Sequence, residues 1–515
     1  MPGLRQSAQP LGSASIGNRS RRDDWDNWAV YTNKTLPLFT AGPAFQILTV
    51  RRKQATKIES IMRKLNMLVA FASVLTFVSS STAAQSSIDG HWEGVMVRQG
   101  SELMVSFDFS DEAAGIRGSF NSLTLHALRI PLRNVTYTPP TVHFLLIGDF
   151  TTMIFDGQSS ATTITGKFRE GANRDGQFRE GDARGGVFHE GEAKGTFSLR
   201  RAEAKKPTFT EEEVSFRNGD VTLSGTLLLP LTKGPHAAAV FLHGSGPEGR
   251  EATRFLAEFF NNNGIAALIS DKRGVGKSTG DWHRSDFGDL AEDAIAGIHF
   301  LQQRKEIDAN KIGIYGHSQG GMIAPLVASR TKVAFVISGA GHAVPLYEGE
   351  INSITNQARA RGVSGSDLAE ATDFIKMRVN VARTGQGWEQ FNSAMEKARE
   401  KNWFRAIRVP PKDDWSWASL KSILDYNAAD YWAKVTVPAL VMYGEKDLYT
   451  PVSQSISNID RALKKAGNRD YSVIVFPRAS HTFDIEADAG QPFEWSRMAP
   501  GFPDLVIAWL HERMR

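Results

Sequence analysis

The segment Gly316-His317-Ser318-Gln319-Gly320 constrains the fold of this chain more than any other feature of its sequence. It follows a short apolar run at 311–315, which predicts a buried strand. It precedes small and apolar residues at 321–329, which predict a helix packed on a sheet. A G-x-S-x-G motif between a strand and a helix requires a sharp turn, which its glycines tolerate. The turn leaves the Ser318 hydroxyl projecting at the end of the strand, so Ser318 is the candidate nucleophile.

The same motif occurs a second time, at Gly276-Lys277-Ser278-Thr279-Gly280. The residues that follow, 281–284, do not predict the start of a helix that packs on a sheet. The segment also imitates a phosphate-binding loop, but the position five residues before its Gly-Lys pair is Asp271 where that loop needs glycine. The context therefore favours Ser318 over Ser278 and argues against a nucleotide site.

Two later apolar runs predict strands that end in polar loops with candidate partners for the serine. The run at 438–444 leads to Asp447, the candidate acid, with Glu445 as the alternative. The run at 471–476 leads to His481, the candidate general base. Histidine titrates near neutrality, so it can take the serine proton and return it to a leaving group. A buried carboxylate on the other ring nitrogen fixes the tautomer.

Backbone amides are the expected donors to a developing oxyanion. One is the N–H of Gln319, directly after the candidate nucleophile. The other is expected from the glycine-rich loop 243–247, which follows a predicted strand at 237–242. Either Gly244 or Ser245 can supply that amide, and the sequence does not decide between them.

Together these motifs resemble the α/β-hydrolase superfamily. The resemblance rests on HGSGP at 243–247, DKRGVGKS at 271–278, GHSQG at 316–320, GEKD at 444–447 and SHTF at 480–483. Over residues 207–515 the chain is similar to bacterial esterases grouped with serine aminopeptidase-like and dienelactone-hydrolase-like domains. The resemblance implies an α/β fold with a doubly wound, mostly parallel sheet and a catalytic triad of Ser318, Asp447 and His481. We interpret Asp271 and Arg273 as residues that brace a loop.

A long insertion is expected within this domain. About 100 residues separate the predicted strand at 333–338 from the next one, more than a crossover needs, so a mostly helical cap is predicted at about 343–432. The cap contains Trp388, Trp403, Trp415, Trp417 and Trp432. Such aromatics can line an apolar pocket or form the core of the cap, and for any single tryptophan we favour the core.

The N-terminal part predicts a secretory signal peptide at 62–84, with basic residues, a 14-residue apolar stretch at 65–78 and small residues before Gln85. The apolar stretch is shorter than the roughly 20 residues of a spanning helix. We therefore expect translation to begin at Met62 and residues 1–61 to be a non-native upstream extension, placed before the true start of the gene. The mature chain is then expected to be periplasmic or secreted by a bacterium, without a lasting membrane anchor. The alternative is a genuine extension with a signal-anchor helix.

Residues 88–202 show short alternating apolar runs, which predict a small antiparallel β domain, either a barrel or a sandwich. Its end repeats with a period of ten residues, beginning at Phe168, Phe178 and Phe188. We interpret the repeat as an expanded strand and turn, in preference to a binding surface. A short charged linker, 202–206, follows.

Composition excludes several classes of function. The chain has 0 cysteines, which excludes disulfides, a thiol nucleophile and cysteine-ligated metals. The net charge of +4 comes from interspersed acidic and basic residues, so nucleic acid is not an expected partner. No metal-ligand spacing is evident, and we expect neither a catalytic metal nor a cofactor.

Three functions are consistent with the sequence. The first is a serine hydrolase that cleaves small carboxylic esters through an acyl-serine intermediate. The second is a peptidase or aminopeptidase on the same triad, for which Glu348 and Glu350 are candidates to bind a free amino terminus. The third is a non-catalytic binding protein whose β domain holds the ligand. The intact order of Ser318, acid and histidine favours the first.

Overall fold

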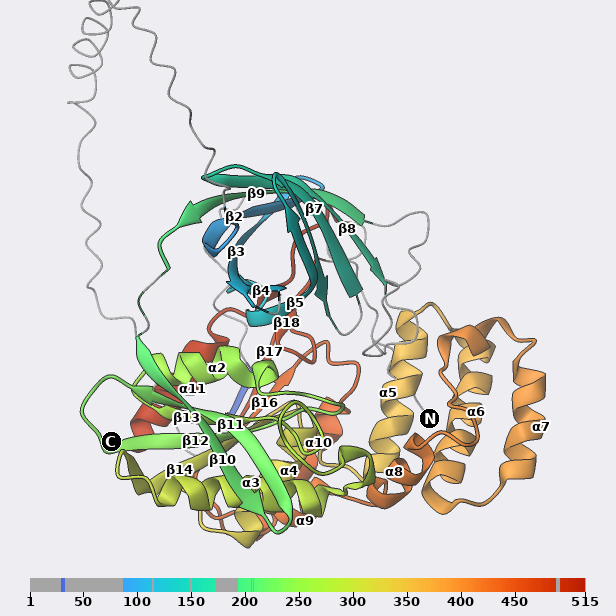
Figure 1. Cartoon of the computed structure of the whole chain (residues 1–515). Coiled ribbons are helices and arrows are strands. Elements are labelled where there is room, and N and C mark those ends of the chain that lie inside the picture. The colour runs from blue at the N-terminus through green and yellow to red at the C-terminus, as the bar shows by residue number, and fades with distance from the viewer. Residues whose placement is uncertain are drawn as a thin grey trace, which may run out of the picture.

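In the computed structural model, the described residues are 29–32, 87–113, 115–148, 151–172, 193–204, 206, 208–487 and 491–514. The predicted signal peptide and the second and third copies of the ten-residue repeat lie outside them. The described chain forms an antiparallel β-barrel, an α/β domain and a helical cap (Figure 1). No helix in these described ranges is both long and apolar enough to cross a membrane.

The N-terminal β domain is a closed barrel in which each strand pairs with the next and the last returns to the first. Its strands are β2 (Gly90–Arg98), β3 (Ser101–Glu112), β4 (Gly115–Ser122), β5 (Ala127–Thr138), β6 (Thr141–Ile147), β7 (Thr151–Ser159), β8 (Thr163–Ala172) and β9 (Ala193–Ala202). The structure therefore decides between the two predicted architectures in favour of the barrel, which leaves no open sheet edge.

Aromatic side chains fill the interior of the barrel. Alternate residues point inward along a strand, as in β3, where Phe107 and Phe109 are both buried. Phe144 and Phe155 from neighbouring strands stack with ring centroids 4.7 Å apart. An eight-stranded barrel is just wide enough for side chains to fill. The interior is thus a packed core, which weakens the hypothesis of a ligand-binding barrel lumen.

The α/β domain is built on a nine-stranded sheet with the order β1-β17-β16-β15-β14-β12-β13-β11-β10. Its strands are β10 (Phe209–Asn218), β11 (Val221–Pro230), β12 (His236–Leu242), β13 (Ala266–Ser270), β14 (Ile307–His317), β15 (Val336–Gly339), β16 (Ala439–Gly444) and β17 (Tyr471–Phe476), with β1 (Ala29–Thr32) at one edge. Neighbouring strands are parallel all the way across the sheet from β13 to β17, while β10, β11 and β1 pair with their neighbours in antiparallel fashion. This is the predicted mostly parallel sheet.

Two apolar cores lie on opposite faces of the sheet. The alternation of β12 shows the division, because Ala238 and Val240 belong to one core while Ala239 and Phe241 belong to the other. The first core is covered by α3 (Phe287–Gln302), α4 (Gln319–Arg330) and α10 (Val452–Lys465), and the second by α2 (Glu251–Asn262) and α11 (Phe502–Met514). Helices on both faces explain why these strands are buried throughout.

The predicted cap lies between β15 and β16 and projects to one side of the sheet (Figure 1). Its helices are α5 (Leu346–Ala360), α6 (Gly365–Thr384), α7 (Trp388–Ala398), α8 (Ser416–Ile423) and α9 (Ala428–Trp432). Trp403, Trp417 and Trp432 are buried, and Trp388 packs on Trp417 with ring centroids 4.9 Å apart. Most of the cap tryptophans therefore serve its core, and Trp415 is the exception described below.

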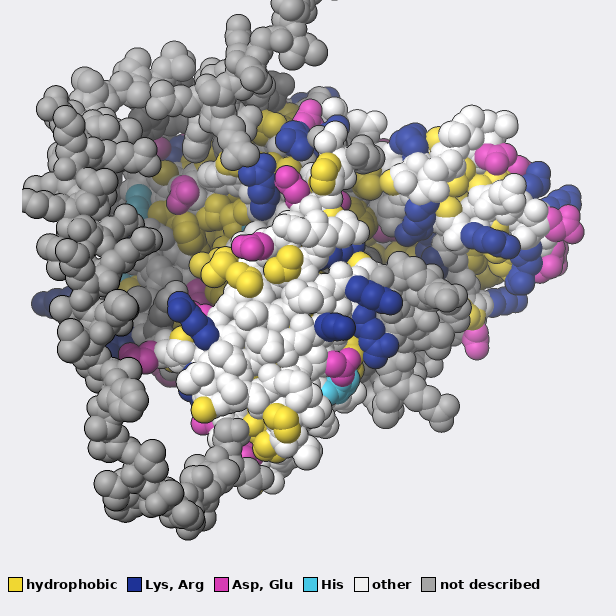
Figure 2. Space-filling model, turned by 90° about the horizontal axis from the view of Figure 1, so that it is seen from above, with side chains coloured by type: hydrophobic (Ala, Val, Ile, Leu, Met, Phe, Trp, Pro, Cys, Tyr) yellow, Lys and Arg dark blue, Asp and Glu magenta, His cyan; other side chains and the backbone are white. Residues whose placement is uncertain are grey.

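The surface carries charges of both signs. Figure 2 shows Lys and Arg side chains interspersed with Asp and Glu side chains on the face seen from above. That distribution agrees with the net charge of +4 for the whole chain.

Candidate active site

Ser318 lies in the tight turn between β14 and α4, as the motif predicts. Its backbone has φ 55° and ψ −115°, a left-handed value that is rare for a residue with a side chain. Glycine is required on both sides, because a Cβ on Gly316 would lie 2.2 Å from the carbonyl oxygen of Gly320. A Cβ on Gly320 would lie 2.6 Å from the carbonyl oxygen of Leu242. Close packing of strand and helix thus holds Ser318 in its strained position.

The structure brings the three predicted residues together in one hydrogen-bonded chain. Nε2 of His481 lies 2.9 Å from Oγ of Ser318, and Nδ1 of His481 lies 2.8 Å from Oδ2 of Asp447. The three side chains come from loops at the carboxyl ends of β14, β16 and β17, which meet at one edge of the parallel sheet. The arrangement can move a proton from the serine to the imidazole while the carboxylate holds the ring.

Asp447, and not Glu445, occupies the position of the acid. The second carboxylate oxygen of Asp447 accepts hydrogen bonds from the backbone N–H groups of Tyr449, at 2.8 Å, and Thr450, at 3.0 Å. Burial alone would raise the pKa of Asp447, but the hydrogen bond from His481 and those backbone donors outweigh it, so the pKa is lowered. Glu445 instead accepts a hydrogen bond from the backbone N–H of Arg478.

A second histidine, His317, supports the loop that carries His481. Its Nε2 lies 2.9 Å from the backbone carbonyl oxygen of His481, and because that oxygen can only accept, Nε2 carries the hydrogen. Burial lowers the pKa of His317 to about 4. His317 is therefore uncharged at neutral pH and adds no positive charge beside His481.

The candidate oxyanion donors lie in the same cleft, and the structure distinguishes between the two that the sequence left open. The N–H of Gly244 donates to the carboxylate of Glu248 at 2.7 Å and is already engaged. The N–H groups of Ser245 and Gln319 have no hydrogen-bond partner in the described part of the chain. Gln319 is also the first residue of α4, where the helix dipole favours negative charge.

Lys272 is a residue of this site that sequence reasoning missed. Its side chain is buried, and Nζ donates to the carbonyl oxygens of Gly244 at 2.6 Å and Gly246 at 2.7 Å, with Oε1 of Gln319 at 3.3 Å. In a trans peptide the carbonyl oxygen of Gly244 and the N–H of Ser245 point in opposite directions. By holding that carbonyl, Lys272 sets the direction of the Ser245 N–H.

We expect Lys272→Met to lower kcat about 10- to 100-fold with little change in KM, because the Ser245 N–H loses its fixed direction while the cleft keeps its shape. Loss of a whole oxyanion donor costs about 10²–10³-fold, which sets the upper limit. Steady-state kinetics on a p-nitrophenyl ester measures kcat and KM separately. Lys277→Met is the matched control, since Lys277 is an exposed lysine of the same segment and does not line the cleft. Equal effects in both variants would contradict this role.

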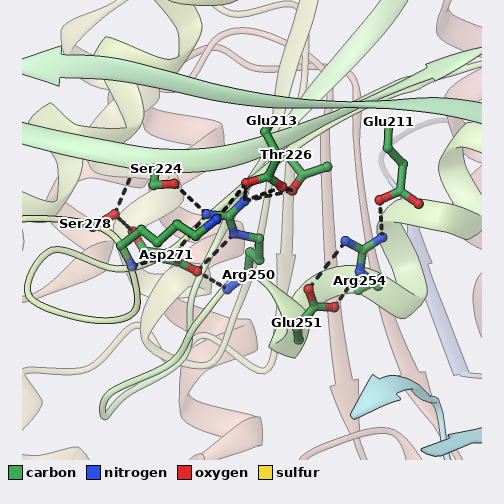
Figure 3. Close-up of polar contacts among 10 residues, drawn as sticks. Glu211, Glu213, Ser224, Thr226, Arg250, Glu251, Arg254, Asp271 and Ser278 are labelled. Atoms are coloured by element: carbon green, nitrogen blue, oxygen red, sulfur yellow. Dashed lines mark hydrogen bonds and ion pairs between the residues drawn. The ribbon is translucent and has the colours of Figure 1, made fainter. Parts of the chain in front are cut away.

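Asp271 and Ser278 brace the loop after β13 (Figure 3). Asp271 forms a two-point ion pair with Arg250, at 3.1 Å to Nε and 2.9 Å to Nη2, and both side chains are buried. Oγ of Ser278 donates to the carbonyl oxygen of Asp271 and accepts from the N–H of Ser224. The second G-x-S-x-G motif is therefore structural. Arg273 likewise pairs with Asp293 at 2.7 Å.

We expect Asp271→Asn to lower the free energy of unfolding by about 3–5 kcal/mol, because it leaves the buried Arg250 without its main counter-ion. Glu213, which also pairs with Arg250, is the control: its side chain is 63 % exposed, so Glu213→Gln should cost under about 1 kcal/mol. Urea unfolding measures the loss in both variants.

The stabilisation by Asp271 depends on pH. Burial would raise the pKa of Asp271, but hydrogen bonds from Arg250 and the Lys277 N–H lower it overall. The stabilisation is thus present above about pH 3.9, the pKa of an unfolded aspartate, and lost as the pH falls further. Similar losses in both variants would contradict the prediction.

The loops that carry Ser318, Asp447 and His481 open into a cleft of about 2080 Å³, larger than the roughly 300–1,000 Å³ of ordinary ligand pockets. Ser318 and His481 lie on its wall, with contributions from the cap and from the barrel. Trp415 of the cap faces it and meets Trp282, whose ring centroid is 5.0 Å away. The catalytic loops alone do not enclose a substrate, so the cap and barrel form the remaining walls.

Residues 233–488 match the family model described as "Serine aminopeptidase, S33". This stretch contains the strands β12 to β17 and the residues Ser318, Asp447 and His481. The chain carries an α/β-hydrolase domain. This α/β-hydrolase is similar to the esterase EstD of Thermotoga maritima, with 25% identity over 312 residues that cover 58% of this chain and 67% of EstD. It is also similar to the quorum-quenching protein AidA of Acinetobacter baumannii, with 33% identity over 128 residues, 24% of this chain and 42% of AidA. About a third or more of each relative lies outside the match.

Two solved structures are similar to this α/β-hydrolase domain. An esterase of Pyrococcus furiosus has 20% identity and a TM-score of 0.38, covering 59% of this chain and 90% of its own. Est1E of Butyrivibrio proteoclasticus, solved with ferulic acid bound, has 17% identity and a TM-score of 0.37, covering 58% of this chain and 98% of its own. The sequence match assigns residues 233–488 to an α/β-hydrolase domain.

Proposed function

We propose that this protein hydrolyses carboxylic esters through an acyl-serine intermediate on Ser318. The observation that carries the proposal is the unbroken hydrogen-bonded chain from Ser318 through His481 to Asp447. A serine hydroxyl is a weak nucleophile until a neighbouring base takes its proton. The esterase named among the relatives gives further support for an ester substrate.

In the first half of the reaction, Oγ of Ser318 attacks the ester carbonyl carbon while Nε2 of His481 takes the hydroxyl proton. The carbonyl oxygen becomes an oxyanion, to which the N–H groups of Ser245 and Gln319 donate hydrogen bonds. Asp447 stabilises the imidazolium through Nδ1. The tetrahedral intermediate then collapses, the alcohol leaves with the proton from His481, and the acyl group stays on Ser318.

In the second half, water attacks the acyl carbon and His481 takes its proton. The same two amides stabilise the second oxyanion. Collapse breaks the bond to Oγ of Ser318, which regains its proton from His481, and the carboxylic acid is released. All proton transfers therefore pass through one imidazole, as the geometry at 2.9 Å from Ser318 allows.

A peptidase on the same residues is the second candidate, and one observation favours it. Glu350 lines the cleft, where a carboxylate could bind a free amino terminus. Glu348 does not line the cleft and accepts a hydrogen bond from the Tyr347 hydroxyl. Arg378 also lines the cleft and acts electrostatically on Glu350. Burial raises the pKa of Glu350, although the charge of Arg378 opposes that rise. A carboxyl group that burial makes harder to ionise is a poor partner for an ammonium group, which supports a neutral ester at this wall.

Hydrolysis of a p-nitrophenyl ester series beside an aminoacyl-nitroanilide series tests the proposal. Ester turnover that disappears in Ser318→Ala would support it, and the preferred acyl length would measure the accessible depth of the cleft. Turnover of the anilides alone would replace the proposal with the peptidase. A further comparison, Glu350→Gln, should leave ester turnover within about threefold and should abolish anilide turnover if Glu350 binds an amino terminus.

We further propose that the mature chain begins near Gln85 and is exported, because residues 62–84 have the pattern of a cleaved signal peptide. Expression in a Gram-negative host followed by N-terminal sequencing of the periplasmic fraction measures this. Val74→Arg, which places a charge in the apolar stretch, is the control and should keep the protein in the cytoplasm. Retention of residues 1–61 in the exported protein would contradict the proposal, and would agree with the pairing of Ala29–Thr32 along β17.

A further inference from the structure

The barrel contributes directly to the cleft that holds Ser318. Leu125 and His126, in the turn between β4 and β5, line this cleft together with Ser318 and His481. Thr151, at the start of β7, lines it as well. A domain that merely extended the chain would not place side chains there. The barrel turn therefore faces whatever occupies the space beside the catalytic serine.

The contacts of His126 hold it at the boundary between the two domains. Its ring stacks on Phe255 of α2, with centroids 5.0 Å apart, and its Nδ1 lies 3.4 Å from Oδ1 of Asp484. Asp484 follows His481 by three residues, so this contact joins the barrel turn to the loop of the catalytic histidine. The backbone of His126 has φ 53°, a strained value for histidine, which indicates that its surroundings fix it.

One ring nitrogen of His126 is buried and unused. Among the described residues Nε2 has no hydrogen-bond partner, although His126 lines the cleft. Burial lowers the pKa of His126 to about 4, so the ring is uncharged at neutral pH. The carboxylate of Asp484 beside Nδ1 favours the tautomer with its hydrogen there. Nε2 is then an acceptor that lacks a donor.

A second set of contacts joins the barrel to residues that follow the His481 loop in sequence. Phe493 and Trp495, which follow the His481 loop, reach the barrel: Nε1 of Trp495 donates to the carbonyl oxygen of Ser101 at 3.2 Å, and Trp495 belongs to the apolar core of the barrel. The guanidinium of Arg98 lies 4.0 Å from the ring centroid of Phe493. The domains are thus joined by buried aromatic contacts, and the barrel turn has a defined position over the cleft.

We propose that the barrel forms a specificity wall of the active site, and that Nε2 of His126 accepts a hydrogen bond from a hydroxyl or amide hydrogen of the substrate. The inference rests on the proposed esterase function. A wall of this kind favours esters that carry a donor in the part held against the barrel, because a wholly apolar ester leaves the buried nitrogen unpaired. The substrate class is therefore a hydroxylated or amide-bearing ester.

The test uses His126→Phe in the full chain, with His143→Phe as the matched control. His143 is a barrel histidine that pairs with Asp156 at 2.8 Å and does not line the cleft. The substrates are methyl benzoate against its 3- and 4-hydroxy derivatives, which vary the acyl side, and benzyl acetate against hydroxybenzyl acetates, which vary the alcohol side. The quantity compared is the kcat/KM ratio of the hydroxylated to the plain ester.

We expect His126→Phe to lower this ratio about tenfold on one side of the ester, and His143→Phe to leave the ratio unchanged. An unchanged ratio in a folded variant, or an equal fall for every ester, would overturn the inference. If His126→Phe fails to fold, His126→Asn replaces it, because asparagine tolerates a left-handed backbone and is too short to reach the same point. It should lower the ratio too.

Calorimetric binding of the uncleaved esters to Ser318→Ala separates the two proposals. A preference for the hydroxylated ester that depends on His126, without turnover in the wild type, would reject the esterase function and keep the specificity wall. Ester turnover without any dependence on His126 would support the esterase function and reject the specificity wall. Binding and turnover that both ignore His126 would leave the barrel with a supporting role alone.

Discussion

Ser318→Ala is expected to lower ester turnover by about 10⁶-fold, because the triad acts as a unit and removal of its nucleophile leaves only binding and the oxyanion donors. The Ser318 hydroxyl lies 2.9 Å from Nε2 of His481. Among the described residues, no other hydroxyl group is hydrogen-bonded to that nitrogen. The measurement is kcat on the best p-nitrophenyl ester, with circular dichroism to establish that the variant is folded. The substitution removes one oxygen atom from a turn that is already strained, so the fold should be kept.

Ser278→Ala is the matched control, since it changes the serine of the second G-x-S-x-G motif. Ser278 is buried and hydrogen-bonded to Asp271 and Ser224, so its loss should lower the stability by about 1–3 kcal/mol. Turnover per folded molecule should stay within a few-fold of the wild type. A large loss of turnover in Ser278→Ala beside a small one in Ser318→Ala would reverse the assignment.

Asp447→Asn is expected to lower kcat by about 10⁴-fold with little effect on KM. If the single oxygen of the amide still accepts from the Tyr449 and Thr450 N–H groups, its NH₂ donor faces Nδ1 of His481. The imidazole would then lose both its fixed tautomer and the charge that stabilises the imidazolium. Stopped-flow measurement of acylation would show the loss in the chemical step.

Glu445→Gln provides the comparison for Asp447, because Glu445 precedes it by two residues and lines the same cleft. Its carboxylate accepts from the Arg478 N–H, a contact that glutamine preserves through its carbonyl oxygen. Turnover should therefore fall less than about fivefold. If Glu445→Gln were the more damaging of the two, Asp447 would not be the acid.

The catalytic loops could be located from the sequence because their signals are local. The turn at Ser318 needs glycines at fixed positions, and the strands before Asp447 and His481 are short apolar runs that end in polar loops. The observed strands Ala439–Gly444 and Tyr471–Phe476 agree with those runs. A parallel sheet then brings the loops together without further information. Gly244 and Ser245 could not be separated, because the choice depends on a side chain, Glu248, that occupies one amide.

The roles of Lys272 and His126 could not be predicted from the sequence, for a different reason. Lys272 acts through carbonyl groups of a loop 26–28 residues away, and nothing in its own segment distinguishes it from Lys277. His126 reaches the cleft only because two domains pack against each other. Alternating apolar residues predicted strands in residues 88–202, but closure into a barrel depends on the pairing of β2 with β9. Such long-range contacts leave no periodic trace in one chain.

The aromatic pair Phe493 and Trp495 has a consequence for how the molecule responds to proteases. The described residues between β9 and β10, 203, 204, 206 and 208, are exposed and offer a favourable cleavage site. A cut there would separate the barrel from the residues that follow it in sequence. Because Trp495 belongs to the barrel core, the two fragments should co-elute as one nicked particle. Electrophoresis under denaturing conditions would show two bands where size-exclusion chromatography shows a single peak, and the nicked protein should keep its ester turnover.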